Sequence, residues 1–225
     1  MRWSWDSDTR ACEHQDFTVS PVRALLEHTL TFCLVRRGNH APSSLHQLQG
    51  LGHAALALGH VDLQCAHLES AALRYQEAID YYRAAADSAE IDALSSLANV
   101  ERLLGNLTQA EAHSRMALEK YRLSEDMFGT IVALAQLGHI YLDAGRLDQA
   151  SQALIEALDL ARGAEDEEGE GDASLGLAEV DLRQHRIEQA LFEAQAALEA
   201  YTVGSDDRGI AEARRLLNAI HLQDG

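Results

Sequence analysis

The sequence is poor in residue types that several classes of protein require. Lys120 is the only lysine among 225 residues, and the formal net charge is −18. Nucleic acids and anionic membranes are bound through clustered cations, so neither is expected as the main partner. No run approaches the ~18 apolar residues of a membrane-spanning helix. The N-terminus also lacks the apolar segment of a signal peptide.

Cysteine, proline and aromatic residues are scarce too. Cys12, Cys33 and Cys65 are odd in number and lack CxxC spacing, so neither a disulfide framework nor a zinc ribbon is expected. A reducing compartment, and hence a cytoplasmic location, fits this usage. The two prolines, Pro21 and Pro42, leave the rest of the chain without a helix breaker. With 47% hydrophobic but only 5% aromatic residues, the chain should fold as helices packed on helices.

Common catalytic and cofactor motifs are absent from the sequence. It contains no GxSxG, P-loop, GxGxxG or HExxH pattern, so we expect a non-catalytic protein without a cofactor. The acidic run 165–172 lacks the residue order of an EF-hand calcium loop and is better explained as solvated helix caps. Four histidines recur at intervals of seven residues: His46, His53, His60 and His67. Seven residues span about 10.5 Å along a helix, too far for two ligands of one zinc ion, so no metal site is expected.

What the sequence does contain is a repeat of about 40 residues. Segments 97–118 and 137–158 share a Leu-small pair, a Gly-x-Leu-x-Gln-Ala stretch and a final Ala-Leu pair. A fixed period of this size indicates units stacked in an array, each burying one face against its neighbours. Small residues beside the leucine seam should let the paired helices approach closely; they are Gly59, Ala98, Gly138 and Ala178.

The ends of the expected helices also recur. Gly105 and Gly145 should end the first helix of their units because glycine accepts a positive φ. Ala66 and His185 take the same place in two other units, so their turns should be more strained. At the unit boundaries, four aspartates occur at the same phase and are predicted to cap the next helix: Asp87, Asp126, Asp166 and Asp206.

This pattern resembles the tetratricopeptide repeat (TPR). The resemblance depends on a large-small pair, an aromatic residue, a turn glycine and second-helix alanines, here Leu137-Gly138, Tyr141, Gly145, Ala150, Leu154 and Ala157. Units of about 40 residues are similar to the long variety found in kinesin light chains, cell-polarity adaptors and large signalling regulators. The resemblance covers about residues 45–222. At the position that Tyr141 occupies in its unit, the other three units have Asp62, Glu101 and Asp181. The interiors of those three units should therefore be less well filled.

The resemblance implies an all-α fold, namely a right-handed α-solenoid of antiparallel helix hairpins. The expected organisation is an irregular leader over 1–19, an N-terminal helix over 20–44 that could be a degenerate half-repeat, and the array. The array should comprise four hairpins at about 45–86, 87–126, 127–166 and 167–206, followed by a capping helix over 207–222.

In this family the first helix of each hairpin lines a concave groove, which implies a set of partner-binding candidates. Leu63, Leu142 and Leu182 would anchor an extended or helical peptide there. The clamp for acidic tails known in one subtype is not favoured, because acidic positions such as Asp92 and Glu179 would repel a carboxylate. By register, the candidates are His53, Leu56, His60, Leu63, Asp92, Ser95, Asn99, Arg102, Leu103, Val132, Ala135, His139, Leu142, Asp143, Asp172, Leu175, Glu179, Leu182 and Arg183.

Three functions are compatible with the sequence. The leading hypothesis is a cytoplasmic scaffold or adaptor that holds a peptide segment or helix of another protein in its groove. The second is the sensor or regulatory TPR portion of a larger signalling regulator of the nucleotide-binding STAND type. The third is a self-associating structural protein. The oligomeric state and the identity of the partner do not follow from the sequence.

Overall fold

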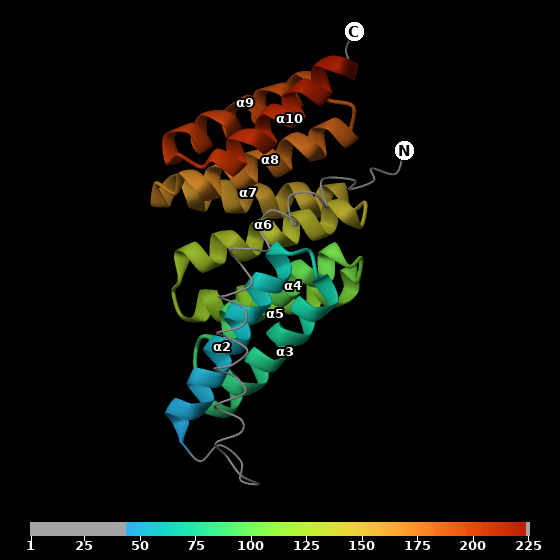
Figure 1. The fold of residues 1–225 in the computed structure, drawn as a ribbon. Helices are drawn as coiled ribbons and strands as arrows, with labels where there is room; N and C mark the ends of the chain where they lie inside the picture. Colours follow the sequence, from blue (N-terminus) through green and yellow to red (C-terminus); the bar gives the residue numbers. More distant parts are fainter. Residues whose placement is uncertain (1–43, 224–225) are drawn as a thin grey trace. The chain divides into compact units, whose positions relative to one another are not determined.

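The computed structural model describes residues 44–223, and every regular element within them is an α-helix (Figure 1). This confirms the predicted all-α class. The predicted leader over 1–19, and all but the last residue of the predicted helix over 20–44, lie outside the described residues. The helices are α2 (Leu45–Gln64), α3 (Leu68–Ala85), α4 (Glu90–Leu103), α5 (Leu107–Leu123), α6 (Met127–Asp143), α7 (Leu147–Ala164), α8 (Glu167–Arg183), α9 (Ile187–Gly204) and α10 (Asp207–Gln223).

The chain divides after Leu104 into two compact units. The described part of the first unit contains α2, α3 and α4, and the second unit contains α5 to α10. The division falls between α4 and α5, which the repeat register assigns to one hairpin. The organisation into four hairpins therefore stays a prediction. Among residues 44–223, no helix combines the length and apolar character that crossing a bilayer requires.

The second unit has an inner and an outer layer of helices. Each helix packs on the next in sequence, and in addition the backbones of α6 and α8, and of α8 and α10, approach one another directly. Within residues 105–223, α5, α7 and α9 show no comparable approach to one another. A stack curves toward the side on which its elements are closer together. Helices α6, α8 and α10 therefore form the inner layer of this unit.

Every turn between helices uses the left-handed region of backbone conformation. Gly105 and Gly145 have φ values of 80° and 70°, as predicted. Ala66 and His185 adopt φ of 57° and 60° without being glycine, which agrees with the predicted strain. A residue with a Cβ atom costs roughly 1–2 kcal/mol in this region. The same conformation occurs at the remaining turns, at Ala86, Glu125, Glu165 and Ser205.

Three of the four predicted aspartate caps are confirmed. Asp126, Asp166 and Asp206 each precede an inner helix, and each carboxylate accepts the backbone N–H of the residue three positions on, which is a glycine in all three cases. Such a bond satisfies one of the unpaired amides at a helix start and contributes ~1 kcal/mol. The N···O distances are 2.9 Å from Gly129, 3.1 Å from Gly169 and 3.0 Å from Gly209.

The prediction for Asp87 is wrong in detail. Helix α4 begins at Glu90 with Ala89 at the N-cap position, two residues after Asp87. Asp87 instead accepts the Ala89 N–H at 3.0 Å and the Gln49 side-chain amide at 2.8 Å. These bonds lower the pKa of Asp87 below its usual value. The aspartate therefore orders the turn before α4 and links it to α2.

Glycines of the first helices provide room for large side chains of the second helices. A Cβ atom at Gly52 would lie 2.6 Å from the Tyr82 ring, and one at Gly171 would lie 2.5 Å from the Tyr201 ring. Carbon atoms normally pack at about 3.5–4.0 Å, so no larger residue fits without a shift. Tyr201 also fills the space at Gly209, which fixes its ring between α8 and α10. The same relation joins Gly59 with Tyr75, Gly129 with Tyr121, and both Gly138 and Gly176 with Leu154.

The acidic residues at the aromatic position of the repeat lie in the interior. Asp62, Glu101 and Asp181 are all buried. The Asp62 carboxylate accepts a hydrogen bond from the Ser70 hydroxyl at 2.5 Å. Asp181 accepts one from Arg186 Nε at 2.9 Å and forms an ion pair with the same guanidinium. For Asp62 and Asp181, a polar contact with the second helix or its start replaces the packing of an aromatic ring.

Replacing His185 with glycine should stabilise the protein by roughly 0.5–1 kcal/mol, because the turn keeps its positive φ and loses the Cβ penalty. Gly145→Ala is the matched control: its φ is 70° and the new Cβ would meet no atom within 4 Å, so only backbone strain changes. It should destabilise by a similar amount. Denaturant unfolding measures both variants, and a change in the same direction for both would contradict the assignment.

Gly171→Ala should destabilise the second unit by ~1–3 kcal/mol, because the added methyl group overlaps the Tyr201 ring. Gly163→Ala serves as control, since no atom lies within 4 Å of a Cβ at that position in α7. Alanine favours helix by up to ~1 kcal/mol over glycine, so the control should be neutral or more stable. Thermal unfolding distinguishes the two, and equal melting temperatures would refute the steric explanation.

Candidate functional site

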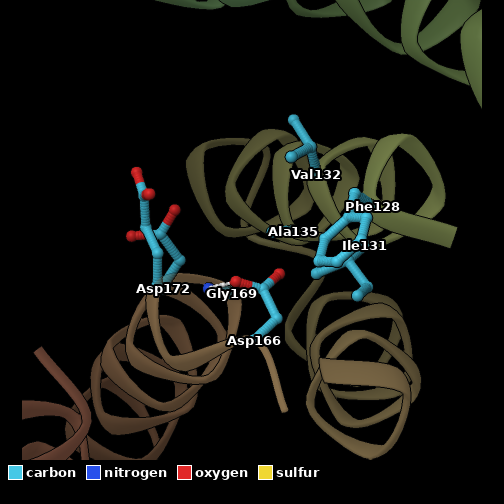
Figure 2. A pocket seen from close by; sticks show the side chains of 8 residues that line it. Phe128, Ile131, Val132, Ala135, Asp166, Gly169 and Asp172 are labelled. Carbon is cyan, nitrogen blue, oxygen red and sulfur yellow. Dashed lines mark hydrogen bonds between the residues drawn. The ribbon is translucent and has the colours of Figure 1, made fainter. Parts of the chain in front are cut away.

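A hollow of about 230 Å³ lies between the inner helices α6 and α8 of the second unit. Figure 2 shows apolar side chains of α6 on one side and carboxylates of α8 on the other. Small-molecule sites usually enclose about 300–1,000 Å³, so this hollow has room for one or two side chains. Its lining residues are Phe128, Ile131, Val132, Ala135, Asp166, Glu168, Gly169 and Asp172.

The α6 wall is apolar and partly open to solvent. Phe128 is 60% exposed and Val132 is 47% exposed, while Ile131 and Ala135 are buried beneath them. A spacing of four residues places Phe128 and Val132 on the same face of the helix. Exposed apolar surface beside a depression is typical of sites that another molecule covers.

The α8 wall is acidic. Asp166, Glu168 and Asp172 supply its carboxylates, and none of the described residues that line the hollow is Lys or Arg. The Asp166 side chain is engaged in capping α8 through Gly169. One oxygen of Asp172, Oδ1, accepts a hydrogen bond from the Tyr201 hydroxyl at 2.6 Å. Asp172 and Glu168 thus add negative charge to the lining of the hollow.

The surroundings of Asp172 oppose its ionisation. The side chain is exposed to solvent at the rim, yet nearby protein removes much of its hydration, and this raises the pKa of Asp172 to about 6. Repulsion from Glu168, Glu212 and Asp206 acts in the same direction. The hydrogen bond from Tyr201 acts against it. Near neutral pH the wall therefore holds a carboxylate whose charge is poorly compensated.

The packing of Tyr201 holds Asp172 in place. The tyrosine ring lies between Gly171 of α8 and Gly209 of α10, so its hydroxyl is directed at the adjacent Asp172. Burial and the negative charge of Asp172 both raise the pKa of Tyr201. The phenol therefore stays protonated and donates to Asp172 throughout the physiological range.

In the first unit, the predicted His53 and His60 are exposed on α2 and pack edge-on against tyrosines. Their rings lie 5.4 Å, centroid to centroid, from Tyr82 and Tyr75 respectively. Although His60 is exposed at the surface, nearby protein removes part of the hydration of its ring, which lowers the pKa of His60, while the charge of Asp92 acts in the opposite direction. No group of three His, Cys, Asp or Glu among residues 44–223 is placed to share a metal ion. His53 and His60 thus pack against aromatic rings, whereas His67 lies 4.0 Å from the Asp62 carboxylate.

The predicted groove residues differ in accessibility. His53, His60, Asp92, Leu103, Val132, Asp143, Asp172 and Arg183 are exposed. Leu56, Leu63, Asn99, Arg102, His139, Leu175, Glu179 and Leu182 are half-buried, and Ser95, Ala135 and Leu142 are buried.

The structure brings only some of these candidates together. Val132, Ala135 and Asp172 line the same hollow. Leu142, a predicted anchor, is 1% exposed, and its carbonyl oxygen accepts a hydrogen bond from Arg183. Leu142 thus belongs to the core, and the proposed binding surface excludes it.

The register of the repeat misses the rest of the hollow. Phe128 and Glu168 lie one helical turn before the predicted Val132 and Asp172. Extending the register toward the N-terminus by four residues would have identified both. Ile131 is a core residue, and the sequence marks Asp166 and Gly169 only as parts of a cap. These three line the hollow because α6 and α8 approach each other near their starts.

Several solved structures resemble the chain. A Rap protein complexed with Competence and Sporulation Factor has a TM-score of 0.69 at 12% identity, covering 92% of this chain and 60% of that one. The apo form of RapI has a TM-score of 0.66 at 11% identity, and the match covers 93% of this chain and 61% of RapI. BtubC (BKLC) from P. vanneervenii has a TM-score of 0.61 at 15% identity, and the match covers 95% of this chain and 93% of BtubC. The chain thus spans about three fifths of the two Rap structures, and identities this low show the fold alone.

Sequence comparison gives the family. A search of curated proteins finds no match. The family model of the tetratricopeptide repeat, however, matches residues 89–163 and 129–202. Together these matches cover just over half of the chain and include α6 to α8, where the hollow lies. The chain therefore belongs to the tetratricopeptide repeat family.

Proposed function

We propose that this protein is a non-catalytic scaffold or adaptor that holds a segment of another protein on the inner face of its stacked helices. The observation that carries the proposal is the hollow between α6 and α8. There, Val132 and Asp172, two predicted groove positions, meet the exposed Phe128 beside an acidic wall. Such a combination of open apolar surface and oriented polar groups suits a protein segment.

The construction of the inner layer supports this role. Asp126 and Asp166 fix the starts of α6 and α8, and the tyrosine and leucine side chains beneath them fix the helix spacing. A surface held by such contacts is already formed before binding, which lowers the conformational entropy lost on association. One structure of similar fold was solved with a second molecule, the Rap protein complexed with Competence and Sporulation Factor.

The exposed candidates of the first unit extend the proposal to that unit. His53 and His60 lie on α2, and Asp92 lies on α4. The Gln49 to Asp87 hydrogen bond links α2 to the turn before α4, and a 3.4 Å contact between His60 and Ser96 joins α2 with α4 itself. The surface is polar, so it suits hydrogen-bonding contacts at the edge of an interface more than apolar anchoring.

A photo-crosslinking amino acid at Val132 should capture another protein from an extract of the host cells. Ile155 is a matched control position, because it is 48% exposed against 47% for Val132 but lies on α7 in the outer layer. The adduct should form at 132 and not at 155, as read by mass spectrometry. Equal capture at both positions, or no foreign adduct at either, would count against binding on the inner face. An adduct with a second copy of the chain would favour the self-associating alternative.

A further inference from the structure

The two walls of the hollow between α6 and α8 differ in chemistry. Phe128 and Val132 on α6 present apolar surface to solvent, being 60% and 47% exposed. Glu168 and Asp172 of α8 also line the hollow, and Figure 2 shows Asp172 across from the apolar side chains of α6. An occupant that satisfies both walls must carry a positive charge close to a bulky apolar group.

The charge around the hollow further limits which ligands can bind. Besides the lining carboxylates, Asp206 and Glu212 lie close enough to Asp172 to raise its pKa. The chain as a whole has a net charge of −18. Phosphate groups of nucleic acids or lipids, acidic peptides and a second copy of this chain would all be repelled. A cation would instead compensate charge that the protein itself leaves uncompensated.

The size of the hollow limits what it can hold. About 230 Å³ is below the volume of most small-molecule sites and accommodates one or two side chains of a longer ligand. The aliphatic stem of Lys or Arg can lie along apolar surface while its charged end reaches a carboxylate. A peptide chain with such a residue beside Leu, Ile, Phe or Trp matches both walls at once.

We propose that the hollow between α6 and α8 selects a basic and apolar peptide segment of a partner protein. A Lys or Arg pairs with Asp172 and Glu168, and a neighbouring bulky apolar residue packs on Phe128 and Val132. This inference rests on the proposed function and names the class of partner segment that the surface takes.

Selection from a phage-displayed library of random decapeptides on the full-length protein tests the proposal. Selected peptides should be enriched in Lys or Arg within two positions of Leu, Ile, Phe or Trp. Enrichment of acidic peptides, or of apolar peptides without a basic residue, would overturn it. The best peptide, labelled with fluorescein, then serves as the probe for anisotropy titrations with variants.

Substitutions in either wall of the hollow should weaken binding of the labelled peptide, whereas similar substitutions elsewhere should not. Asp172→Asn should reduce affinity about two- to fivefold, in the range of a partly exposed ion pair. Phe128→Ala should reduce it by about five- to tenfold through lost apolar burial. Asp159→Asn and Ile155→Ala, which make the same kinds of change on α7, should change it by less than about twofold. Equal losses at the control positions would overturn the assignment.

Stability separates a binding role of Asp172 from a structural one. Folding raises the pKa of Asp172 to about 6, so its ionised form destabilises the folded state above that pH. Asp172→Asn should therefore raise the melting temperature at pH 7.5, and the gain should disappear below about pH 4, where Asp172 is protonated in both states. A variant that is more stable yet binds the probe less tightly has lost a ligand contact. A variant that binds normally would refute the role.

Affinity of the wild type should also fall as the pH drops below about 6, when Asp172 takes up a proton. The groups that face it are Glu168 on the same helix, Tyr201 on α9, and Asp206 and Glu212 at α10. The α6 lining contributes no titratable group. An affinity that is constant between pH 7.5 and 5 would contradict the pairing with Asp172.

The crosslinking and peptide-selection results together distinguish failure of this inference from failure of the proposed function. If the Val132 crosslinker captures a foreign protein but the peptides show no basic preference, binding on the inner face stands and this inference fails. If the crosslinker maps instead to residues 1–43 of the same chain, the occupant is the N-terminal segment, and a partner peptide is excluded as the resident ligand. If no position captures anything, the proposed function itself fails.

Discussion

Close contact between first-helix glycines and large second-helix side chains is the constraint on which both units depend. Tyr82 lies against Gly52 in the first unit, and Tyr201 lies against Gly171 in the second. Such contacts set how near the two layers of helices can come. Because interiors are packed as densely as crystals of small molecules, a change of one methyl group at these points is felt by the neighbouring helices. Aspartate caps and left-handed turns then fix where each helix starts and ends.

The same contact connects the fold with the candidate site. Tyr201 fills the space left by Gly171 and Gly209, and its hydroxyl holds Asp172 at the rim of the hollow. A polar group placed by buried packing keeps its position without a ligand. The poorly compensated charge of Asp172 lowers the stability of the free protein, which is a common property of sites that are completed by a binding partner.

Much of this arrangement can be predicted from the sequence, because it depends on short-range rules. The 40-residue period gives the helices, Gly105 and Gly145 give the turns, and Asp126, Asp166 and Asp206 give the caps. Contacts between layers are harder to predict. From the sequence alone, Gly52 is expected only to weaken α2, whereas in the structure it provides the space that the Tyr82 ring occupies. The recurrence of Tyr82, Tyr121 and Tyr201 at one phase of the repeat was the available signal.

The lining of the hollow follows only in part from the sequence, for a geometric reason. Register places Val132 and Leu142 among the groove candidates, but it cannot determine how deeply each side chain is buried. Val132 lines the hollow and is 47% exposed, whereas Leu142 is 1% exposed and lies in the core. Phe128 and Glu168 line the hollow because the first turns of α6 and α8 lie side by side, which is a property of the packed array.

Leu154 on the outer helix α7 has a consequence for how the second unit moves. Its side chain fills the space beside Gly138 of α6 and also beside Gly176 of α8, so two successive inner helices share one buried leucine. Separating either helix from α7 would expose that leucine and loosen the other. Helices α6, α7 and α8 should therefore exchange their amide hydrogens as a single cooperative segment, and the hollow between α6 and α8 should persist or disappear with it.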